Sequence, residues 1–83
     1  MAYYVYMLLC EDGSYYTGYT KNIESRFRQH KEGIGSRYTR IHKPKKVVYV
    51  EKFSTRGEAL HREKAIKSLT HKKKQTLINS YNS

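Results

Sequence analysis

Two tyrosine-rich segments at the start of the chain, joined by a short turn, limit the folds that this sequence can adopt. Residues 3–9 (YYVYMLL) and 14–19 (SYYTGY) are rich in aromatic and branched side chains, which are typical of β-strands. Between them, Glu11, Asp12 and Gly13 form a typical hairpin turn sequence. The sequence therefore predicts an antiparallel hairpin near the N-terminus.

The length of the hairpin loop decides which tyrosines share a face of the sheet. A two-residue loop, Asp12-Gly13, would place Tyr6 and Tyr16 on opposite faces. A three-residue loop, with Gly13 left-handed in a bulge, would instead pair Tyr6 with Gly18. Tyr16 would then lie diagonal to Tyr6, with about 7–8 Å between their backbones. The bare backbone of Gly18 would leave a notch above the sheet, where a substrate phosphate could approach.

A helix and a third strand are predicted after the hairpin. Asn22 is a suitable N-cap, and inward-facing side chains recur after it at helical spacing, which predicts a helix over about residues 23–31. Residues 32–43 are rich in glycine and basic side chains and are predicted to form a loop that Pro44 closes. Residues 46–53 are predicted to form a strand, and their unbroken apolar run favours a central position in the sheet.

Two further helices complete the predicted fold. The segment TRGE at 55–58 matches a capping box and predicts a helix that runs to about Ser68. Thr70 is expected to cap a last helix that runs through Tyr81. A chain of 83 residues is too short for a second core, so residues 1–83 form one domain. We expect an α+β fold, with a small three-stranded antiparallel sheet flanked by about three helices in the order β-β-α-β-α-α.

The positive charge of the chain is strong and unevenly distributed. Lys and Arg number 17 against 7 Asp and Glu, which gives a net charge of +10. Residues 1–20 carry a charge of −2, whereas residues 21–83 carry +12. A field of this size raises the local concentration of polyanions, and we therefore expect nucleic acid as the partner.

Other partners and compartments are less compatible with this sequence. The longest apolar run, Val5 to Cys10, spans six residues, whereas about 20 are needed to cross a bilayer. We therefore expect no membrane partner. Cys10 is the single cysteine, which excludes an intrachain disulfide and a multi-cysteine metal site. The N-terminal residues lack the basic segment of a signal peptide, so we expect a cytoplasmic protein.

Three polar side chains interrupt the apolar faces of the predicted helices. Arg26 and His30 lie on the inward face of the first helix. Glu63 lies on the apolar stripe of the second helix, four residues after Ala59 and three before Ile66. A carboxylate that faces a core lowers the stability of the fold by roughly several kcal/mol unless it is paired or bound to a metal. The three residues therefore indicate a site or, alternatively, an internal ion pair between Arg26 and Glu63 that joins the helices.

The order of these residues resembles the GIY-YIG nuclease superfamily, and in particular its small bacterial single-domain members. The first tripeptide of the family corresponds to YVY at 4–6, and the second to YTG at 16–18. Arg26 and His30 follow on the next helix, and Glu63 on a later one. The resemblance covers nearly the whole chain, and the residues occur in the family's order and spacing.

The resemblance implies hydrolysis of a phosphodiester with one divalent metal ion, Mg²⁺ or Mn²⁺. It implies that Tyr6 and Tyr16 line the active site, that Arg26 steadies the phosphate beside His30, and that Glu63 holds the metal. Because both tyrosines must then reach one phosphate, we prefer the three-residue hairpin loop. An unperturbed phenol is a poor base at pH 7, so the metal and Arg26 would have to lower the pKa of a tyrosine base. His30 would relay the proton.

Some positions differ from the family pattern or leave alternatives open. Tyr4 replaces the glycine of the first tripeptide. The family often has a later asparagine, for which Asn79 and Asn82 are both candidates. Which of Tyr6 and Tyr16 acts as base and which as clamp is open, and tyrosines are also common simply as strand formers. We expect an endonuclease that acts on DNA in preference to RNA.

A non-catalytic nucleic-acid-binding module is the alternative function. It requires only basic side chains around the glycine-rich loop, with Tyr38 as a stacking platform for a base. The candidates are Arg28, Lys31, Arg37, Arg40, Lys43, Lys45 and Lys46. A weaker alternative is a domain whose basic face binds an acidic protein.

Overall fold

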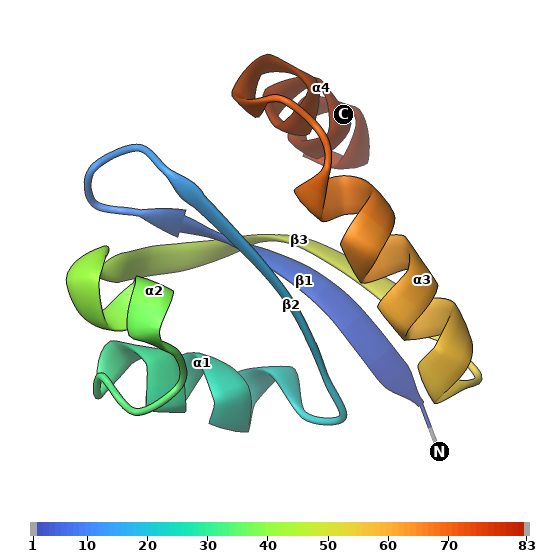
Figure 1. The fold of residues 1–83 in the computed structure, drawn as a ribbon, viewed down its shortest axis with the longest axis horizontal. Coiled ribbons are helices and arrows are strands. Elements are labelled where there is room, and N and C mark those ends of the chain that lie inside the picture. The colour runs from blue at the N-terminus through green and yellow to red at the C-terminus, as the bar shows by residue number, and fades with distance from the viewer. Residues whose placement is uncertain (1, 83) are drawn as a thin grey trace.

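The structure, a computed structural model, describes residues 2–82 as a three-stranded antiparallel sheet with helices on both of its faces (Figure 1). The strands are β1 (Tyr3–Cys10), β2 (Tyr15–Thr20) and β3 (Pro44–Phe53). The helices are α1 (Ile23–Lys31), α2 (Arg37–Ile41), α3 (Arg56–Lys67) and α4 (His71–Asn82). The predicted α+β class and the order β-β-α-β-α-α are confirmed, with α2 as an additional short helix.

The prediction that the third strand is central was wrong, because β1 lies between β2 and β3. Four consecutive side chains of β1, Val5 to Leu8, are at most 1% exposed. The apolar run in β3 has a different cause. Met7 pairs with Tyr49 but Leu8 pairs with Val47, so a bulge inserts Val48 as an extra residue. The run is unbroken because the bulge disturbs the alternation of faces, although β3 is an edge strand.

The hairpin has the register expected for a three-residue loop. Tyr6 pairs with Gly18, and Leu8 pairs with Tyr16. The loop closes through a 3.0 Å hydrogen bond from the Gly13 amide to the Cys10 carbonyl, and Gly13 has a φ of +85°. Because side chains alternate between faces along a strand, this register places Tyr6 and Tyr16 on the same face of the sheet.

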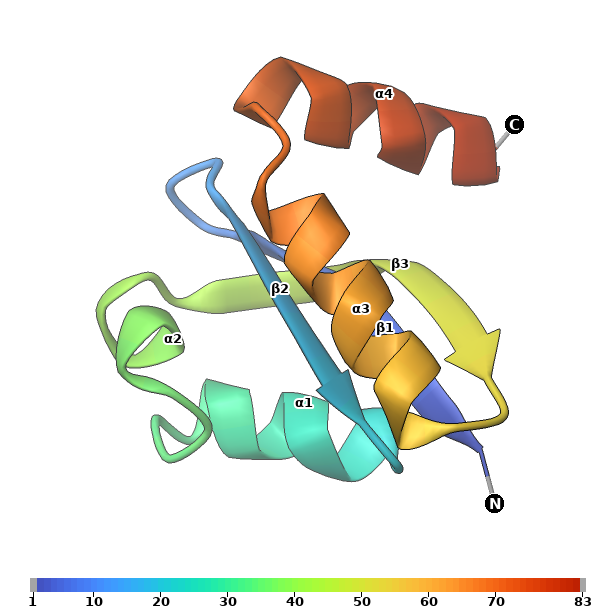
Figure 2. The ribbon, with the colours of Figure 1, turned by 45° about the vertical axis from the view of Figure 1, so that its right-hand side comes forward.

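The two faces of the sheet have different roles. On the core face, Val5, Met7 and Tyr49 pack with Ala59 and Ile66 beneath α3 and α4. On the opposite face, which we call the site face, lie Tyr6, Tyr16 and Gly18, covered by α1 and α2. Figures 1 and 2 show α1 and α2 on one side of the sheet and α3 and α4 on the other. Most of the apolar burial is therefore separated from the face that carries the tyrosine pair.

Capping residues account for the helix boundaries. The side chain of Asn22 accepts a 2.9 Å hydrogen bond from the Ser25 amide at the start of α1, and Thr55 forms the expected capping box at the start of α3. The prediction of a loop over 32–43 was wrong at α2, where the Ser36 side chain accepts a hydrogen bond from the Thr39 amide. A helix of five residues has too little apolar periodicity to be recognised from the sequence. No helix within residues 2–82 is long and apolar enough to cross a membrane.

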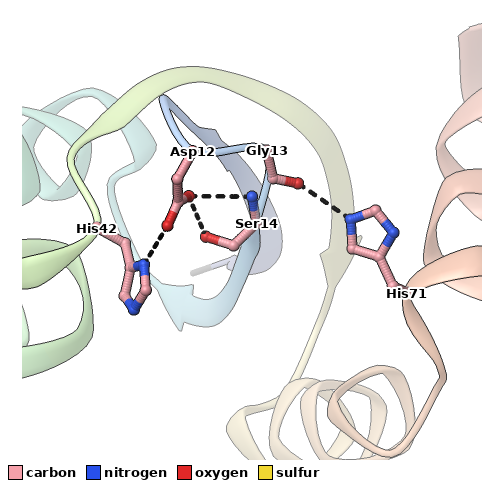
Figure 3. A network of polar contacts seen from close by, with 5 residues as sticks. All are labelled: Asp12, Gly13, Ser14, His42 and His71. Atoms are coloured by element: carbon pink, nitrogen blue, oxygen red, sulfur yellow. Dashed lines mark hydrogen bonds and ion pairs between the residues drawn. The ribbon is translucent and has the colours of Figure 1, made fainter.

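The tip of the hairpin is held from two sides (Figure 3). Asp12 accepts hydrogen bonds from the amide and hydroxyl of Ser14 and forms an ion pair with His42 at the end of α2. His71, at the start of α4, lies 3.0 Å from the Gly13 carbonyl oxygen. The His71 ring also stacks on Tyr15 at 4.8 Å. These contacts fix the β1–β2 hairpin relative to both helical layers.

A buried hydroxyl on β2 provides a test of the packing. Thr17 is 3% exposed, and its Oγ1 has no hydrogen-bond partner among the described residues. Thr17→Val keeps the shape of the side chain and removes an unpaired polar group, so the free energy of unfolding should rise by about 1 kcal/mol. Urea denaturation of both proteins measures the change. A clear loss of stability would show that this hydroxyl has a partner.

Candidate active site

Four of the residues that the sequence singled out lie together on the site face. The Tyr6 and Tyr16 ring centroids are 6.2 Å apart, and the Tyr16 and His30 rings are 4.8 Å apart. β1 and β2 provide the tyrosines through their register, while α1 provides Arg26 and His30 one turn apart. The structure therefore brings together residues from three elements, as the hairpin register predicts.

His30 is the buried centre of this cluster. Its side chain is fully buried, at 0% exposure. Nε2 lies 2.7 Å from the Tyr6 hydroxyl, and Nδ1 lies 2.7 Å from the Thr39 hydroxyl. Both ring nitrogens are thus paired within the protein, which is what a buried imidazole requires. Thr39, at 1% exposure, belongs to the short helix α2 that the sequence did not predict.

Gly18 has a different role from the one expected. A Cβ added at Gly18 would lie 2.8 Å from the Tyr6 hydroxyl oxygen and 3.0 Å from a Tyr16 ring carbon. The space above Gly18 is therefore occupied by the two rings, and the prediction of an open notch for a phosphate was wrong. Glycine is needed here so that the tyrosine rings can pack down onto β2. As a result Tyr6 is only 1% exposed, while Tyr16 remains half-buried.

Arg26 does not form the alternative ion pair with Glu63. No ion pair among residues 2–82 joins these two side chains. The Arg26 guanidinium instead donates 2.9 Å and 2.8 Å hydrogen bonds, to the Gln29 side chain and to the Gly35 carbonyl. It therefore ties α1 to the segment before α2 and keeps a positive charge beside the tyrosine and histidine side chains.

Burial dominates the protonation states in this cluster. Burial, reinforced by the positive charge of Arg26, lowers the pKa of His30 to about 4. Burial and the neighbouring Tyr16 raise the pKa of Tyr6 well above its ordinary value, although Arg26 acts in the opposite direction. The expected lowering of the pKa by Arg26 is thus outweighed at Tyr6. At pH 7 the cluster contains a neutral imidazole and a protonated Tyr6 phenol.

Gly35 closes the cluster from the α2 side. A Cβ at this position would overlap Nδ1 of His30 and lie 2.8 Å and 2.9 Å from two ring carbons. The backbone of Gly35 therefore lies directly against the imidazole ring, and its carbonyl oxygen is held by Arg26. The sequence showed a glycine-rich loop here but not the reason for this glycine.

Glu63 comes from α3, on the other helical layer. Its side chain is 15% exposed, and its ion-pair partner is Lys67 at 3.5 Å, whose own side chain is 52% exposed. After burial and Tyr16, the Glu63 charge also contributes to raising the pKa of Tyr6, so the carboxylate is electrostatically coupled to this cluster. A largely covered carboxylate with one distant, solvated lysine has little compensation for its lost hydration.

Glu63 is a single carboxylate that could hold a hard divalent cation only together with other oxygen ligands. Within residues 2–82 no group of three or more His, Cys, Asp or Glu side chains is positioned to hold a metal. Mg²⁺ can be bound through one carboxylate when water and substrate oxygens complete its shell, and Glu63 offers such an under-compensated oxygen ligand. Glu63 is therefore the residue that would hold the ion.

An open groove of about 400 Å³ runs along the free edge of β2, where the two helical layers separate. Tyr16 and Tyr38 line it from the site face, and Lys67 and Lys74 line it from α3 and α4. Lys67 also forms the ion pair with Glu63, so one of the residues that line the groove contacts the candidate metal ligand. The sequence did not identify Lys67 or Lys74 as site residues, since a lysine on a helix is usually solvated.

The predicted nucleic-acid-binding cations are exposed and free of ion pairs among the described residues. They lie on α1, on α2 and around the start of β3: Arg28, Lys31, Arg37, Arg40, Lys43, Lys45 and Lys46. Tyr38 is half-buried between the Tyr16 and His42 rings, with centroid distances of 5.8 Å and 4.3 Å. It is therefore a wall of the groove, and its stacking on His42 limits its use as a free platform.

The remaining family positions lie outside this cluster. The Tyr4 side chain lines a depression with residues 21–24 near the start of α1, away from the groove. Asn79 is exposed on α4, and the Asn82 amide donates a 2.9 Å hydrogen bond to the Ile78 carbonyl. The sequence also missed Thr39, for which the only signal was a serine three residues earlier that can cap a helix.

The buried neutral His30 predicts acid sensitivity. Its ordinary pKa of 6.5 applies to the unfolded chain, whereas the folded value is about 4. Between these pH values His30 is protonated in the unfolded state but not in the folded state. The free energy of unfolding therefore falls as the pH drops from about 6.5 to 4, by about 3 kcal/mol in all. Urea denaturation across this range should show the slope for the native protein and for His61→Gln, an exposed control. His30→Gln should flatten it, and an unchanged slope would contradict the assignment.

The contact between Gly35 and His30 predicts a specific packing defect. Gly35→Ala places a methyl group in steric overlap with the imidazole ring and should lower the free energy of unfolding by about 1–3 kcal/mol. Gly57→Ala is the matched control, because a Cβ at that position in α3 meets no atom within 4 Å. The control should be neutral or more stable by up to about 1 kcal/mol, as alanine favours helix. Equal effects of the two changes would argue against the close packing.

Comparison with known proteins identifies related chains over nearly the full length. The sequence matches the GIY-YIG catalytic domain over residues 2–81. It is 49% identical over 76 residues to a UPF0213 protein of Staphylococcus saprophyticus, covering 92% of this chain and 93% of that one. A UPF0213 protein of Staphylococcus aureus is 44% identical over 77 residues, with 93% and 94% coverage.

Two solved structures have the same fold. The solution structure of a UPF0213 protein from Bacillus halodurans aligns with a TM-score of 0.61 at 40% identity, covering 95% of this chain and 84% of that one. A solution structure of a protein from E. faecalis aligns with a TM-score of 0.67, also at 40% identity, with 99% and 88% coverage. The sequence match, the relatives and the placement of the tyrosines agree: this chain belongs to the GIY-YIG catalytic domain family, among its UPF0213 members.

Proposed function

We propose that this protein is a divalent-metal-dependent endonuclease that hydrolyses phosphodiester bonds of DNA. The observation that carries the proposal is the groove at the free edge of β2. There the half-buried Tyr16 and the exposed Lys67 line one surface, and the carboxylate of Glu63 lies 3.5 Å from the Lys67 ammonium group. A phenol, cations and a metal-binding carboxylate can supply the proton transfer and the charge stabilisation that phosphodiester hydrolysis uses.

The basic surface binds the substrate. The exposed cations of α1, α2 and the start of β3 have no ion-pair partners among the described residues, so they are available to phosphates. Lys67 and Lys74 extend this positive surface into the groove. Binding by these side chains fixes the path of the sugar-phosphate backbone and is independent of base sequence.

Arg26 holds the phosphate that reacts. Two of its guanidinium N–H groups are used by Gln29 and Gly35, which fixes its orientation. A guanidinium has five N–H donors, so others remain for phosphate oxygens. A positive group placed before the reaction stabilises the negative charge that builds up as water attacks phosphorus and the bond to the 3′ oxygen breaks.

The structure favours different roles for the two tyrosines. Tyr16 is half-buried and lines the groove, so its hydroxyl can contact the attacking water and receive or direct its proton. Tyr6 is buried and hydrogen-bonded to His30, and its raised pKa opposes a role as base. Tyr6 and His30 therefore support Tyr16, whose ring packs against both of theirs.

Glu63 holds Mg²⁺ or Mn²⁺ in this proposal. When bound, such an ion supplies positive charge that stabilises the leaving 3′ oxygen. The partial exposure of Glu63 leaves the carboxylate reachable for an ion, and the contact with Lys67 is long enough at 3.5 Å to be exchanged. A cation at Glu63 would release Lys67 to the substrate phosphates in the groove.

The test is nicking of supercoiled plasmid with Mg²⁺, Mn²⁺ or EDTA, together with single-stranded, branched and RNA substrates. The native protein should nick plasmid with either ion, and EDTA should stop the reaction. Glu63→Ala should lower the rate by about a hundredfold or more, as loss of a transition-state charge group does. Its fold should persist, because a partly buried charge is removed.

Glu32→Ala is the matched control for this experiment. It removes the same charge from an exposed residue at the end of α1 and should leave the rate unchanged. Equal cutting by Glu63→Ala would overturn the proposal. Saturable binding of DNA without cleavage under any of these conditions would instead support a non-catalytic binding module.

A further inference from the structure

A chain of buried hydrogen bonds extends from the candidate active site into α2. Tyr6, His30 and Thr39 are each at most 1% exposed, and two 2.7 Å contacts connect them through the imidazole ring. Thr39 in turn contacts the hydroxyl and the carbonyl of Ser36, the N-cap of α2. Thr39 does not line the groove, and its side chain contacts the tyrosine and histidine cluster through His30.

We propose that Thr39 is a positioning residue that fixes the tautomer of His30. Its hydroxyl oxygen accepts a hydrogen bond from the Nδ1–H group of His30. Nε2 is then unprotonated and accepts a hydrogen bond from the Tyr6 phenol. The direction of these bonds is a property of the folded protein. Its consequence for catalysis rests on the nuclease function proposed above.

The surroundings of Thr39 determine the direction of its hydrogen bonds. The Ser36 carbonyl oxygen lies 3.3 Å from Oγ1 of Thr39, can only accept, and also accepts a hydrogen bond from the Arg40 amide; we assign the single hydroxyl proton of Thr39 to this carbonyl. The Ser36 hydroxyl accepts from the Thr39 amide and has its own proton to donate to Oγ1 at 3.0 Å. Oγ1 of Thr39 is then an acceptor toward His30.

The hydrogen bond at the Tyr6 end of this series points in the same direction. A neutral imidazole has one N–H group, and a proton on Nδ1 makes Nε2 an acceptor. Burial and Tyr16 raise the pKa of Tyr6, so its phenol keeps the proton that Nε2 requires. Every buried donor from Tyr6 to Ser36 then has one acceptor, with none left unpaired.

The imidazole has little freedom to change this arrangement. The backbone of Gly35 lies against the ring on one side, and the Tyr16 ring lies 4.8 Å from it. Arg26 holds the Gly35 carbonyl in place. Flipping the ring would break both of its 2.7 Å hydrogen bonds in a site without exposure to water.

The His30 tautomer matters for the site because it decides whether the Tyr6 hydroxyl donates or accepts the hydrogen bond with His30. With its proton directed to His30, the Tyr6 oxygen presents lone pairs to its other neighbours, among which Arg26 carries a positive charge that favours them. The opposite tautomer would turn the phenol proton toward that charge. Thr39 thus helps to hold Arg26 and the ring of Tyr16 in the positions that a phosphate would meet.

Nitrogen-15 NMR of the imidazole groups at pH 7 tests the tautomer without any substrate. His30 of the native protein should show a protonated Nδ1 and a bare Nε2. Thr39→Ser keeps the hydroxyl and should keep this pattern, whereas Thr39→Val should lose it. Thr17→Val removes a buried hydroxyl on the core face and should leave the His30 signals unchanged.

Cleavage kinetics test the positioning role. Thr39→Val should lower kcat by about tenfold, with KM changed less than about twofold, because substrate-binding cations are untouched. Thr39→Ser should restore kcat to within about threefold of the native value. A purely structural defect would instead change the amide spectrum widely and would not be rescued selectively in kcat.

Several outcomes would overturn the inference. Protonation of Nε2 in the native protein would reverse the assigned direction, and an unchanged kcat in a folded Thr39→Val would remove the positioning role. If Thr39→Val does not fold, the Thr39→Ser variant provides the test. Loss of the Nδ1-protonated tautomer or a tenfold lower kcat in Thr39→Ser would contradict the proposal. Absence of any cleavage by the native protein would refute the nuclease function and with it the role in catalysis, while the NMR spectra would still decide the direction of the bonds.

Discussion

The hydrogen-bond register between β1 and β2 is the constraint on which the candidate site depends. With Tyr6 opposite Gly18, the tyrosines lie on one face and Val5 and Met7 lie on the other. A shift by one residue would place Tyr6 and Tyr16 on opposite faces, with one of the two phenols directed into the apolar core. The bulged turn at Gly13 sets this register, and the contacts of Asp12 and Gly13 with the two helical layers hold it.

The site face shows how a small domain can bury polar groups. His30, Thr39 and Tyr6 satisfy one another in a chain of short hydrogen bonds, and burial keeps both ionisable groups neutral at pH 7. The charged groups are placed further out. Arg26 is tied by neutral partners, and Glu63 lies on α3 in contact with Lys67, which lines the groove. The proposed chemistry therefore takes place where a neutral, rigid interior meets a positively charged surface.

Much of the fold could be predicted from local sequence signals. Asn22 and the capping box at Thr55 mark helix starts because side chains that satisfy free amides act over a few residues. The position of β3 in the sheet could not be predicted in the same way. Its apolar run comes from a bulge opposite β1, and a bulge depends on a partner strand distant in sequence. The short helix α2 was missed because five residues carry no clear periodicity.

The candidate site, like the fold, could be predicted from the sequence only in part. The sequence by itself determined the chemical groups: tyrosines on both hairpin strands, Arg26 and His30 on one helix face, and an isolated Glu63 on an apolar stripe, because these follow from spacing within single elements. Only the tertiary structure decided that Tyr6 is buried and Tyr16 accessible, that Gly18 is filled by rings, and that Thr39 and Lys67 belong to the site. Burial and hydrogen bonding at these positions depend on how separate elements pack, which no local pattern records.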